Sequence, residues 1–151
     1  MRNTLTVEKE IEVRFNEVDN YNIVWHGNYA IYLESARQAF ANKYGLGHRE
    51  MLDQGYYIPL TKLTINYKKP LIYNDIITVV IRYKDCPQTK ILFDYEIYRK
   101  KDHTLMSTAE SEQAIVGLDW NLKLFPPPYF QEWKDRWLTT HNHPIIENIC
   151  Q

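Results

Sequence analysis

Hydrophobic and polar residues alternate along the start of the chain. Between Leu5 and Phe15, every second residue is apolar, with Lys9 as the only exception. Because successive side chains of a strand point to opposite faces, this pattern predicts a strand with one face in the core and one in water. The wet face would carry Thr6, Glu8, Glu10, Glu12 and Arg14.

The pattern changes between Asn28 and Tyr44, where the chain has no Pro or Gly and apolar residues recur at spacings of three or four. This spacing predicts a long helix with Asn28 as its N-cap and Gly45 and Gly47 at its end, followed by a short helical turn before Gly55. The apolar surface extends beyond one stripe, so we expect other elements to wrap the helix.

The rest of the chain is predicted to be mostly strand. Stretches rich in β-branched and aromatic residues are separated by polar, turn-forming segments, and they cover residues 57–68, 76–84, 90–100 and 105–118. Hairpin connections favour an antiparallel meander over a parallel sheet. Residues 126–137 are typical of a turn into a short terminal helix. We therefore predict an α+β fold in one domain, residues 1–151, with a core of about 5–120 and a C-terminal extension over 121–151.

Charge and composition restrict the possible partners. The 18 Lys and Arg against 19 Asp and Glu give a net charge of −1, which argues against bulk attraction to nucleic acid or an anionic membrane. No apolar run approaches the ~20 residues needed to cross a bilayer, and the N-terminus lacks an apolar signal core. Cys86 and Cys150 form no close pair, which suits a reducing compartment. These features predict a cytoplasmic protein with no membrane span and no nucleic-acid partner.

The most specific motif lies between Glu17 and Arg37, and it reads E-V-D-N-Y-N-I-V-W-H-G-N-Y-A-I-Y-L-E-S-A-R. It resembles, without gaps, the signature of the hotdog-fold acyl-CoA thioesterases of the 4-hydroxybenzoyl-CoA thioesterase type. That signature is approximately D-x-D-x-x-G-x-V-x-(H or aromatic)-x-N-Y, followed by an aromatic-rich helix ending E-x-A-R. A weaker resemblance continues through residues 61–75 and 114–119, so that most of residues 7–120 is covered.

Two positions depart from the signature. Glu17 stands where the motif usually has Asp, and Asn22 stands where it usually has Gly. Asn is among the few residues other than Gly that readily reach positive φ, so we expect the turn to be kept.

The resemblance implies a helix wrapped by a five-stranded antiparallel sheet, subunits paired as dimers and often as tetramers, and hydrolysis of acyl-CoA thioesters. It assigns Asp19 as the catalytic carboxylate, acting as nucleophile or general base. It assigns the backbone N–H of His26 as the donor that polarises the thioester carbonyl, with the His26 side chain as a second catalytic candidate. Asn28 and Tyr29 match the pair that starts the helix.

The residue types suit this chemistry on physical grounds as well. Thioester hydrolysis needs a group that attacks the carbonyl or activates water, and donors for the developing oxyanion. Asp19, beside Tyr21 and Trp25, can supply the first, and the unpaired N–H groups at a helix start can supply the second. Together with the resemblance, this leads us to predict that Asp19 and His26 are catalytic and that Trp25, Asn28 and Tyr29 contact the substrate.

Basic residues cluster near strand ends and hairpin tips, where the family places the phosphates and adenosine of CoA, and Lys90 is the substrate-binding candidate among Arg82, Lys84, Lys90, Arg99 and Lys100. Glu34 and Arg37 are expected to form a surface or interface pair. His141, His143 and Cys150 lack the spacing of a structural zinc module, so we expect no metal and no cofactor.

Several alternatives stay open at this point. The chain could be a non-catalytic acyl-binding or scaffolding protein on the same fold, or its substrate could be carried by acyl carrier protein instead of CoA. A hotdog dehydratase is disfavoured, because its His and acidic residue usually stand in a different arrangement. The sequence does not choose an aromatic, short or long acyl group, nor a homodimer or a homotetramer.

Overall fold

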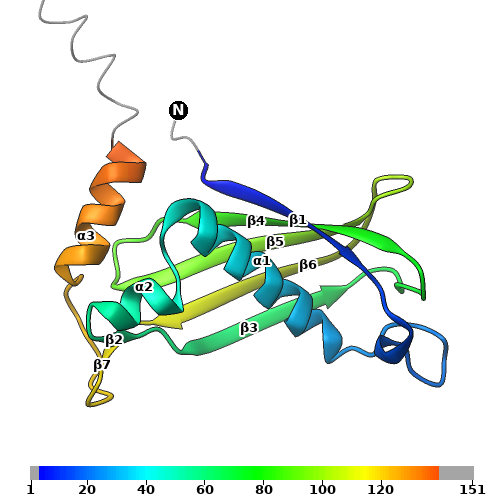
Figure 1. Ribbon diagram of the computed structural model, residues 1–151, viewed down its shortest axis with the longest axis horizontal. Helices are drawn as coiled ribbons and strands as arrows, with labels where there is room; N and C mark the ends of the chain where they lie inside the picture. The colour runs from blue at the N-terminus through cyan, green and yellow to red at the C-terminus, as the bar shows by residue number, and fades with distance from the viewer. Residues whose placement is uncertain (1–3, 140–151) are drawn as a thin grey trace, which may run out of the picture.

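The computed structural model describes residues 4–139, and Figure 1 shows a sheet curled around one long helix. The helix is α1 (Asn28–Tyr44), and the sheet is built from the strands β1 (Thr6–Glu12), β3 (Leu60–Tyr67), β4 (Ile76–Lys84), β5 (Lys90–Arg99) and β6 (Thr104–Ala114). The smaller elements are η1 (Phe15–Glu17), α2 (His48–Asp53), β2 (Tyr56–Tyr57), β7 (Val116–Gly117), α3 (Pro128–Lys134) and η2 (Asp135–Thr139).

The five strands are antiparallel and lie in the order β1-β4-β5-β6-β3. The meander predicted from the hairpin signals holds for β4, β5 and β6. It is wrong for β3, which pairs with β6 and not with β4. The connection from β3 to β4 is not a hairpin, because its residues bond elsewhere: Val24 N–H donates to the Leu71 carbonyl at 2.8 Å, and Ile23 forms a β-bridge with Ile72.

Two of the predicted strands are interrupted. The stretch 57–68 divides into β2 and β3 around Ile58 and Pro59, and the stretch 105–118 divides into β6 and β7 at Ile115. β2 and β7 pair with each other in a separate two-stranded sheet. The interruptions let the end of each long strand turn away from the main sheet.

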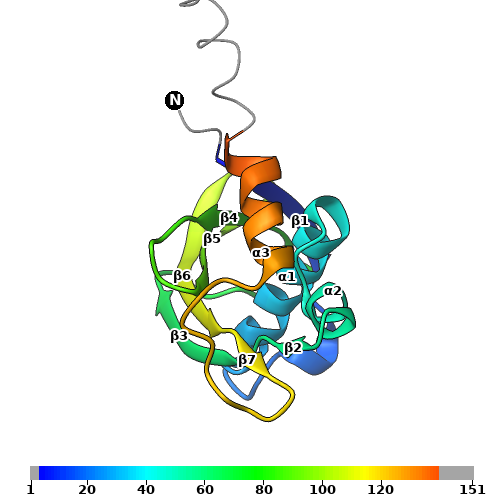
Figure 2. The same ribbon diagram turned by 90° about the vertical axis from the view of Figure 1, so that its left-hand side faces the viewer.

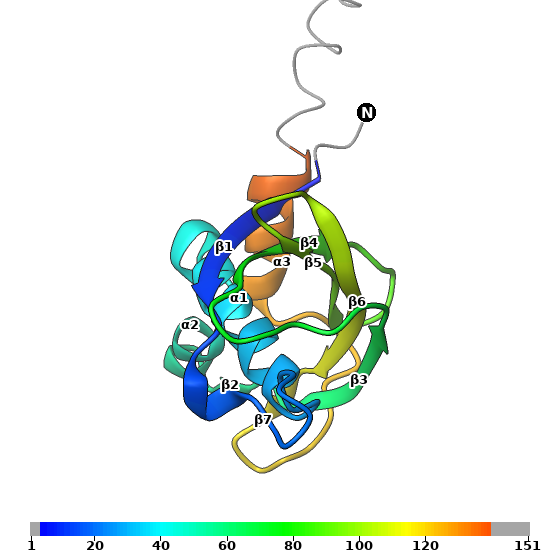
Figure 3. The same cartoon turned by 90° about the vertical axis from the view of Figure 1, so that its right-hand side faces the viewer.

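The inner face of the sheet packs on α1, as the two end-on views show (Figure 2 and Figure 3). Alternate residues of β4 and β5 are buried against buried helix residues, which explains the nearly continuous apolar surface of the helix. The main contributors are Tyr32, Leu33, Ala36, Phe40, Ile77, Val79, Ile81, Ile91, Phe93, Tyr95 and Ile97.

Both ends of α1 lie close to their predicted positions. Gly45 has φ 74° and its N–H donates to the Ala41 carbonyl at 2.8 Å, so it ends α1 in the left-handed conformation that glycine adopts without cost. At the other end the N-cap is Gly27, and Asn28, predicted to be the cap, is the first helical residue. The Asn28 side chain is engaged elsewhere, as described below.

The short terminal helix, α3, closes the sheet at the C-terminal end of α1. Trp133 is buried, and its Nε1–H donates to the Tyr44 carbonyl at 2.7 Å, while the Tyr129 hydroxyl donates to the Gly45 carbonyl at 2.7 Å. The terminal helix thus satisfies two carbonyls that the end of α1 leaves unpaired. Within residues 4–139, no helix is long and apolar enough to cross a membrane.

Candidate functional site

The loop before α1 is a tight turn centred on Asp19. Val18 and Val24 form a β-bridge, Asp19 N–H donates to the Ile23 carbonyl at 2.9 Å, and Asn22 N–H donates to the Asp19 carbonyl at 3.0 Å. Asn22 has φ 61°. Asparagine therefore takes the left-handed conformation that the motif usually gives to glycine, and the turn is kept as expected.

This turn leaves one oxygen of the Asp19 carboxylate free. Oδ1 accepts the Tyr21 N–H at 2.8 Å, whereas Oδ2 accepts no hydrogen bond from the described residues 4–139. Asp19 is half-buried and lines an open cavity of about 470 Å³. The other lining residues are Tyr21, Ile23, Val24, His26, Tyr29, Tyr67, Lys68, Lys69 and Pro70.

The residues before α1 have free backbone donors, and one of them, His26, lines the same cavity. The Trp25 carbonyl accepts the Asn28 N–H at 2.9 Å. Because a trans peptide holds its C=O and N–H on opposite sides, the His26 N–H points away from the helix. Neither the His26 N–H nor the Gly27 N–H has an acceptor in the described part of the chain. The positive end of the helix dipole lies at the same place, so negative charge is favoured there.

Trp25 lies against this helix start. Its ring is half exposed and sits over Gly27, where a Cβ atom would overlap the indole. The Trp25 and His26 rings are 4.9 Å apart between centroids. A glycine is therefore needed at position 27, because only glycine lets the Trp25 indole approach the backbone so closely. The indole covers the peptide between His26 and Gly27.

Glu17 fixes the loop to the helix. Its carbonyl accepts the Trp25 N–H at 2.9 Å and Asn28 Nδ2–H at 2.8 Å, and its Oε1 accepts the Tyr32 hydroxyl at 3.1 Å. Burial, and then the neighbouring Glu17 carboxylate, raise the pKa of Tyr32, so the phenol stays protonated as the donor. Asn28, predicted to contact the substrate, thus uses its side-chain amide to hold the loop.

Two tyrosines form the floor of the cavity. Tyr29, a predicted substrate contact, is buried and packs edge-to-face on Tyr67, with ring centroids 4.8 Å apart. The Tyr67 hydroxyl donates to the His26 carbonyl at 3.0 Å, and so helps to fix the helix start. Tyr67, Lys68 and Lys69 were not among the residues singled out from sequence. The sequence placed them at the end of a predicted strand, but it did not indicate that this strand would end beside the loop that contains Asp19.

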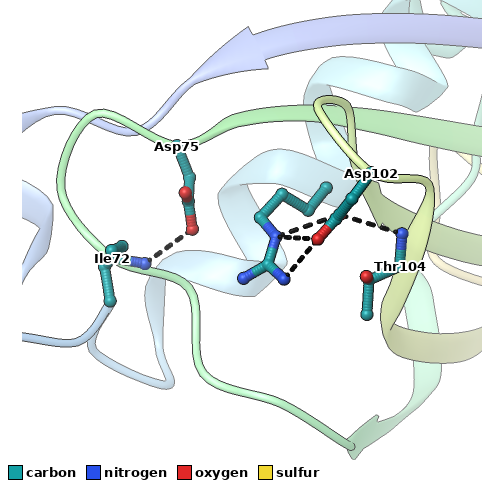
Figure 4. Close-up of polar contacts among 5 residues, drawn as sticks. Ile72, Asp75, Asp102 and Thr104 are labelled. Atoms are coloured by element: carbon teal, nitrogen blue, oxygen red, sulfur yellow. Dashed lines mark hydrogen bonds and ion pairs between the residues drawn. The ribbon is translucent and has the colours of Figure 1, made fainter.

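The connection from β3 to β4 forms the outer wall, and a buried carboxylate sets its shape (Figure 4). Asp75 Oδ2 accepts the Ile72 N–H at 3.0 Å, and the Asp75 carbonyl accepts the Val13 N–H at 2.9 Å. On the neighbouring hairpin, Arg99 pairs with Asp102 at 2.7 Å, and the guanidinium holds the pKa of that carboxyl well below its usual range.

Lys90 lies away from this cavity in the same chain. It pairs with Ala114 in the sheet register, at the end of β5 opposite to the end near Tyr67, and its Nζ is 3.7 Å from Glu112. A contact between Lys90 and CoA stays a prediction. The other basic candidates are also paired with carboxylates: Arg82 with Glu96, Lys84 with Asp94, Arg99 with Asp102 and Lys100 with Glu10.

Of the two helix residues Glu34 and Arg37, the first lies at the surface and the second is mostly buried. Arg37 Nη2 is 3.5 Å from Glu34, which is exposed, but the Arg37 side chain is 13% exposed and its Nη1 donates to the Tyr95 hydroxyl at 3.3 Å. The predicted pair is thus present, but Arg37 is not a surface residue, because it reaches toward the inner face of the sheet. A place for the pair at a subunit interface stays a prediction. Residues 4–139 contain no group of three His, Cys, Asp or Glu arranged to hold a metal ion. His141, His143 and Cys150 lie outside the described residues.

A five-stranded antiparallel sheet curled around a long helix, with a carboxylate and the helix start on one cavity, is the architecture of a hotdog-type thioesterase fold. Comparison with protein-family models matches the thioesterase-like superfamily over residues 13–138. The chain belongs to this superfamily.

Individual proteins agree with this assignment. "Putative acyl-CoA thioesterase YneP" of Bacillus subtilis is 29% identical over 134 residues, which are 89% of this chain and 94% of that protein. The crystal structure of a DHNA-CoA thioesterase from Staphylococcus aureus is 28% identical with a TM-score of 0.77, covering 97% of this chain and 95% of that one. A 4-hydroxybenzoyl-CoA thioesterase complexed with 4-hydroxybenzoyl-CoA shares the fold at 18% identity, with a TM-score of 0.74 and coverage of 85% and 98%.

Proposed function

We propose that this protein is an acyl-CoA thioesterase in which Asp19 is the catalytic carboxylate and the His26 N–H binds the oxyanion. The observation that carries the proposal is the placement of both groups on one cavity, each with an unused hydrogen-bonding capacity. Asp19 Oδ2 accepts no hydrogen bond and the His26 N–H donates none within residues 4–139. A free carboxylate oxygen and a free donor at a helix N-terminus are the two groups that thioester hydrolysis requires.

The reaction consumes one water and releases a free acid and the CoA thiol. In one route, Asp19 attacks the thioester carbonyl, CoA leaves as the thiolate and takes up a proton, and water then hydrolyses the acyl–Asp19 anhydride. In the other, Asp19 removes a proton from a water molecule that attacks the carbonyl directly. Both routes place negative charge on the carbonyl oxygen, where the His26 N–H and the helix dipole stabilise it.

The relatives support CoA as the thiol. Both the Bacillus subtilis relative and the Staphylococcus aureus structure carry the name of a CoA thioesterase and match nearly the whole chain. The tyrosines that line the cavity offer flat, apolar surface with polar edges, against which an acyl group can pack.

The direct test is thiol release from a panel of aliphatic and aromatic acyl-CoAs. We expect turnover of at least one ester well above its spontaneous hydrolysis, measured by reaction of free CoA with a thiol reagent. Binding without turnover across the panel would instead support a non-catalytic acyl-binding protein. If only esters of acyl carrier protein are hydrolysed, the thiol of the substrate is acyl carrier protein and not CoA, and the assignment of Asp19 is unaffected.

Lys68 and Lys69 are candidates for the phosphates of CoA. Both are exposed, both line the Asp19 cavity, and neither has a carboxylate partner within residues 4–139. This distinguishes them from the basic residues on the outer face of the sheet. An unpaired lysine beside the reactive carboxylate can bind a phosphate as a point charge without first breaking an ion pair.

Replacing both lysines, in Lys68→Ala/Lys69→Ala, is therefore expected to raise KM for acyl-CoA about tenfold and leave kcat within about twofold, since about 1.4 kcal/mol of ground-state binding is lost. The matched control is Lys43→Ala/Lys84→Ala, which removes two exposed lysines that do not line the cavity. A thioester of a short thiol without the nucleotide should show no difference between the variant and the parent. An equal rise in KM for that short ester would contradict the assignment to phosphate.

A further inference from the structure

Tyr67 is the last residue of β3, and its hydroxyl bonds to the residue that supplies the proposed oxyanion donor. This hydroxyl donates to the His26 carbonyl at 3.0 Å. Both residues line the Asp19 cavity, although they are 41 positions apart in sequence. Neither reaction route gives the hydroxyl a part in the chemistry, so its contact with this one peptide needs a reason.

The His26 carbonyl has no comparable second donor. Within residues 4–139, the only other hydrogen bond to it comes from the Tyr29 N–H, at 3.4 Å. An ordinary N–H···O bond measures about 2.7–3.2 Å between nitrogen and oxygen, so the bond from Tyr29 is weak. The Tyr67 hydroxyl is therefore the main group that fixes the direction of the His26 carbonyl.

The carbonyl and the N–H of His26 belong to two successive peptide planes that meet at one Cα atom. The Asn28 N–H holds the first plane, because it donates to the Trp25 carbonyl at 2.9 Å. Tyr67 holds the second plane through the His26 carbonyl. With both planes held, φ and ψ of His26 have little freedom, and the His26 N–H keeps one direction.

Tyr67 is itself held firmly at the end of its strand. The Lys68 N–H and the Lys69 N–H both donate to the Met106 carbonyl at 3.0 Å, which anchors this end of β3 to β6. The Tyr67 ring packs edge-to-face on the buried Tyr29 ring, and burial raises the pKa of Tyr67, so the hydroxyl stays protonated as a donor at neutral pH. Figure 1 shows the end of β3 and the loop before α1 at the same end of the molecule. A rigid part of the sheet thus holds the peptide at the helix start.

We propose that Tyr67 is a positioning residue, whose hydroxyl holds the His26 peptide so that the His26 N–H meets the oxyanion of the transition state. This inference rests on the proposed function, because it needs the His26 N–H as the oxyanion donor. A donor that is fixed before the reaction stabilises the developing charge without having to reorient. The oxyanion carries more charge than the substrate carbonyl, so loss of the positioning slows the chemical step more than it weakens substrate binding.

Tyr67→Phe tests the role of the hydroxyl, because it keeps the ring that packs on Tyr29. We expect kcat for thiol release to fall about tenfold, less than the roughly hundredfold or greater loss that follows removal of an oxyanion donor itself. KM should stay within about twofold. A kcat equal to that of the parent would overturn the inference.

Tyr129→Phe is the matched control. The Tyr129 hydroxyl also donates to a backbone carbonyl, that of Gly45 at 2.7 Å, but at the opposite end of α1. This variant should lower the unfolding midpoint at least as much as Tyr67→Phe does, and it should leave kcat unchanged. An equal loss of kcat in the two variants would show a general effect of lost stability and would contradict the positioning role.

Infrared spectroscopy of a bound thioester measures the positioning directly. Hydrogen bonding lowers the stretching frequency of a carbonyl, and an Asp19→Asn background slows turnover enough to record it for an ester with a ¹³C-labelled carbonyl. The frequency should be higher in Asp19→Asn/Tyr67→Phe than in Asp19→Asn alone, because the His26 N–H is then less well aimed. The same frequency in both proteins would count against the inference.

Nuclear magnetic resonance of the unliganded protein gives a readout that needs no substrate. The amide nitrogen of Gly27 shares its peptide group with the His26 carbonyl, so its ¹⁵N shift should move in Tyr67→Phe and stay in place in Tyr129→Phe. An unmoved shift in Tyr67→Phe would contradict the bond on which the inference depends. An active parent with an equally active Tyr67→Phe variant would remove the positioning role and keep the thioesterase assignment, whereas a parent that hydrolyses no ester would remove both.

Discussion

Asp19→Asn is expected to lower kcat by on the order of a thousandfold or more while the protein stays folded. Asparagine keeps an oxygen that can accept the Tyr21 N–H, which Asp19 Oδ1 accepts at 2.8 Å, so the turn should persist. What disappears is the negative charge and basicity of the carboxylate, which both reaction routes require. Steady-state thiol release, with circular dichroism to confirm the fold, measures the effect.

Glu8→Gln is the matched control for this prediction, because it removes an exposed carboxylate on β1 outside the cavity. It should leave kcat unchanged. A single turnover in ¹⁸O-labelled water then tests the nucleophilic route: label in the Asp19 carboxylate requires that Asp19 attacked and that water opened the anhydride at the Asp19 carbonyl, whereas label in the released acid alone fits both routes. Full activity of both Asp19→Asn and Asp19→Ala would remove Asp19 from the mechanism.

Trp133→Ala is expected to lower the free energy of unfolding by about 3–5 kcal/mol, the range for large aromatic truncations in a core. Trp133 is 2% exposed, its ring lies 4.9 Å from the Tyr83 ring, and its Nε1–H bonds to the carbonyl that ends α1. The variant loses the ring contacts and leaves the Tyr44 carbonyl without its donor. Urea unfolding followed by circular dichroism gives the difference.

Trp133→Phe separates the contribution of the hydrogen bond from that of the ring contacts, because phenylalanine keeps an aromatic ring but has no N–H donor. We expect this variant to lower the free energy of unfolding by about 1–3 kcal/mol. Phe125→Ala, at a side chain that is 83% exposed, should change stability by less than about 0.5 kcal/mol. An unfolding midpoint of Trp133→Ala equal to that of the parent would show that α3 contributes little to the stability of the core.

Local patterns were sufficient to predict most elements and the position of Asp19 close to the start of the long helix. The spacing of apolar residues located α1 and the antiparallel strands, and the motif from Glu17 to Arg37 placed Asp19 and the helix start side by side. These features depend on residues close together in sequence, where side-chain periodicity and turn preferences act directly. The N-cap was off by one residue because the Asn28 amide bonds to the Glu17 carbonyl, a choice that propensity alone does not reveal.

Features that depend on distant pairing were not predictable in this way. β3 is followed by a turn-rich segment that resembles a hairpin, yet β3 pairs with β6, because the Ile23–Ile72 bridge holds the connection on the loop before α1. The same pairing brings Tyr67, Lys68 and Lys69 to the Asp19 cavity. Arg37 looked like a surface residue because its helical spacing matches Glu34, whereas its partner Tyr95 is 58 positions away in sequence.

The charges on the edge strand β1 also limit how this protein can polymerise. A sheet with two receptive edges could add copies at both sides and grow into an open ribbon, the geometry of fibrous aggregates. Here β1 carries Glu8, Glu10 and Glu12 on its outer face and Lys9 on the parity of the inner face, and such charges protect an edge against pairing with another strand. The charges of β1 thus protect one edge of the main sheet against this kind of growth.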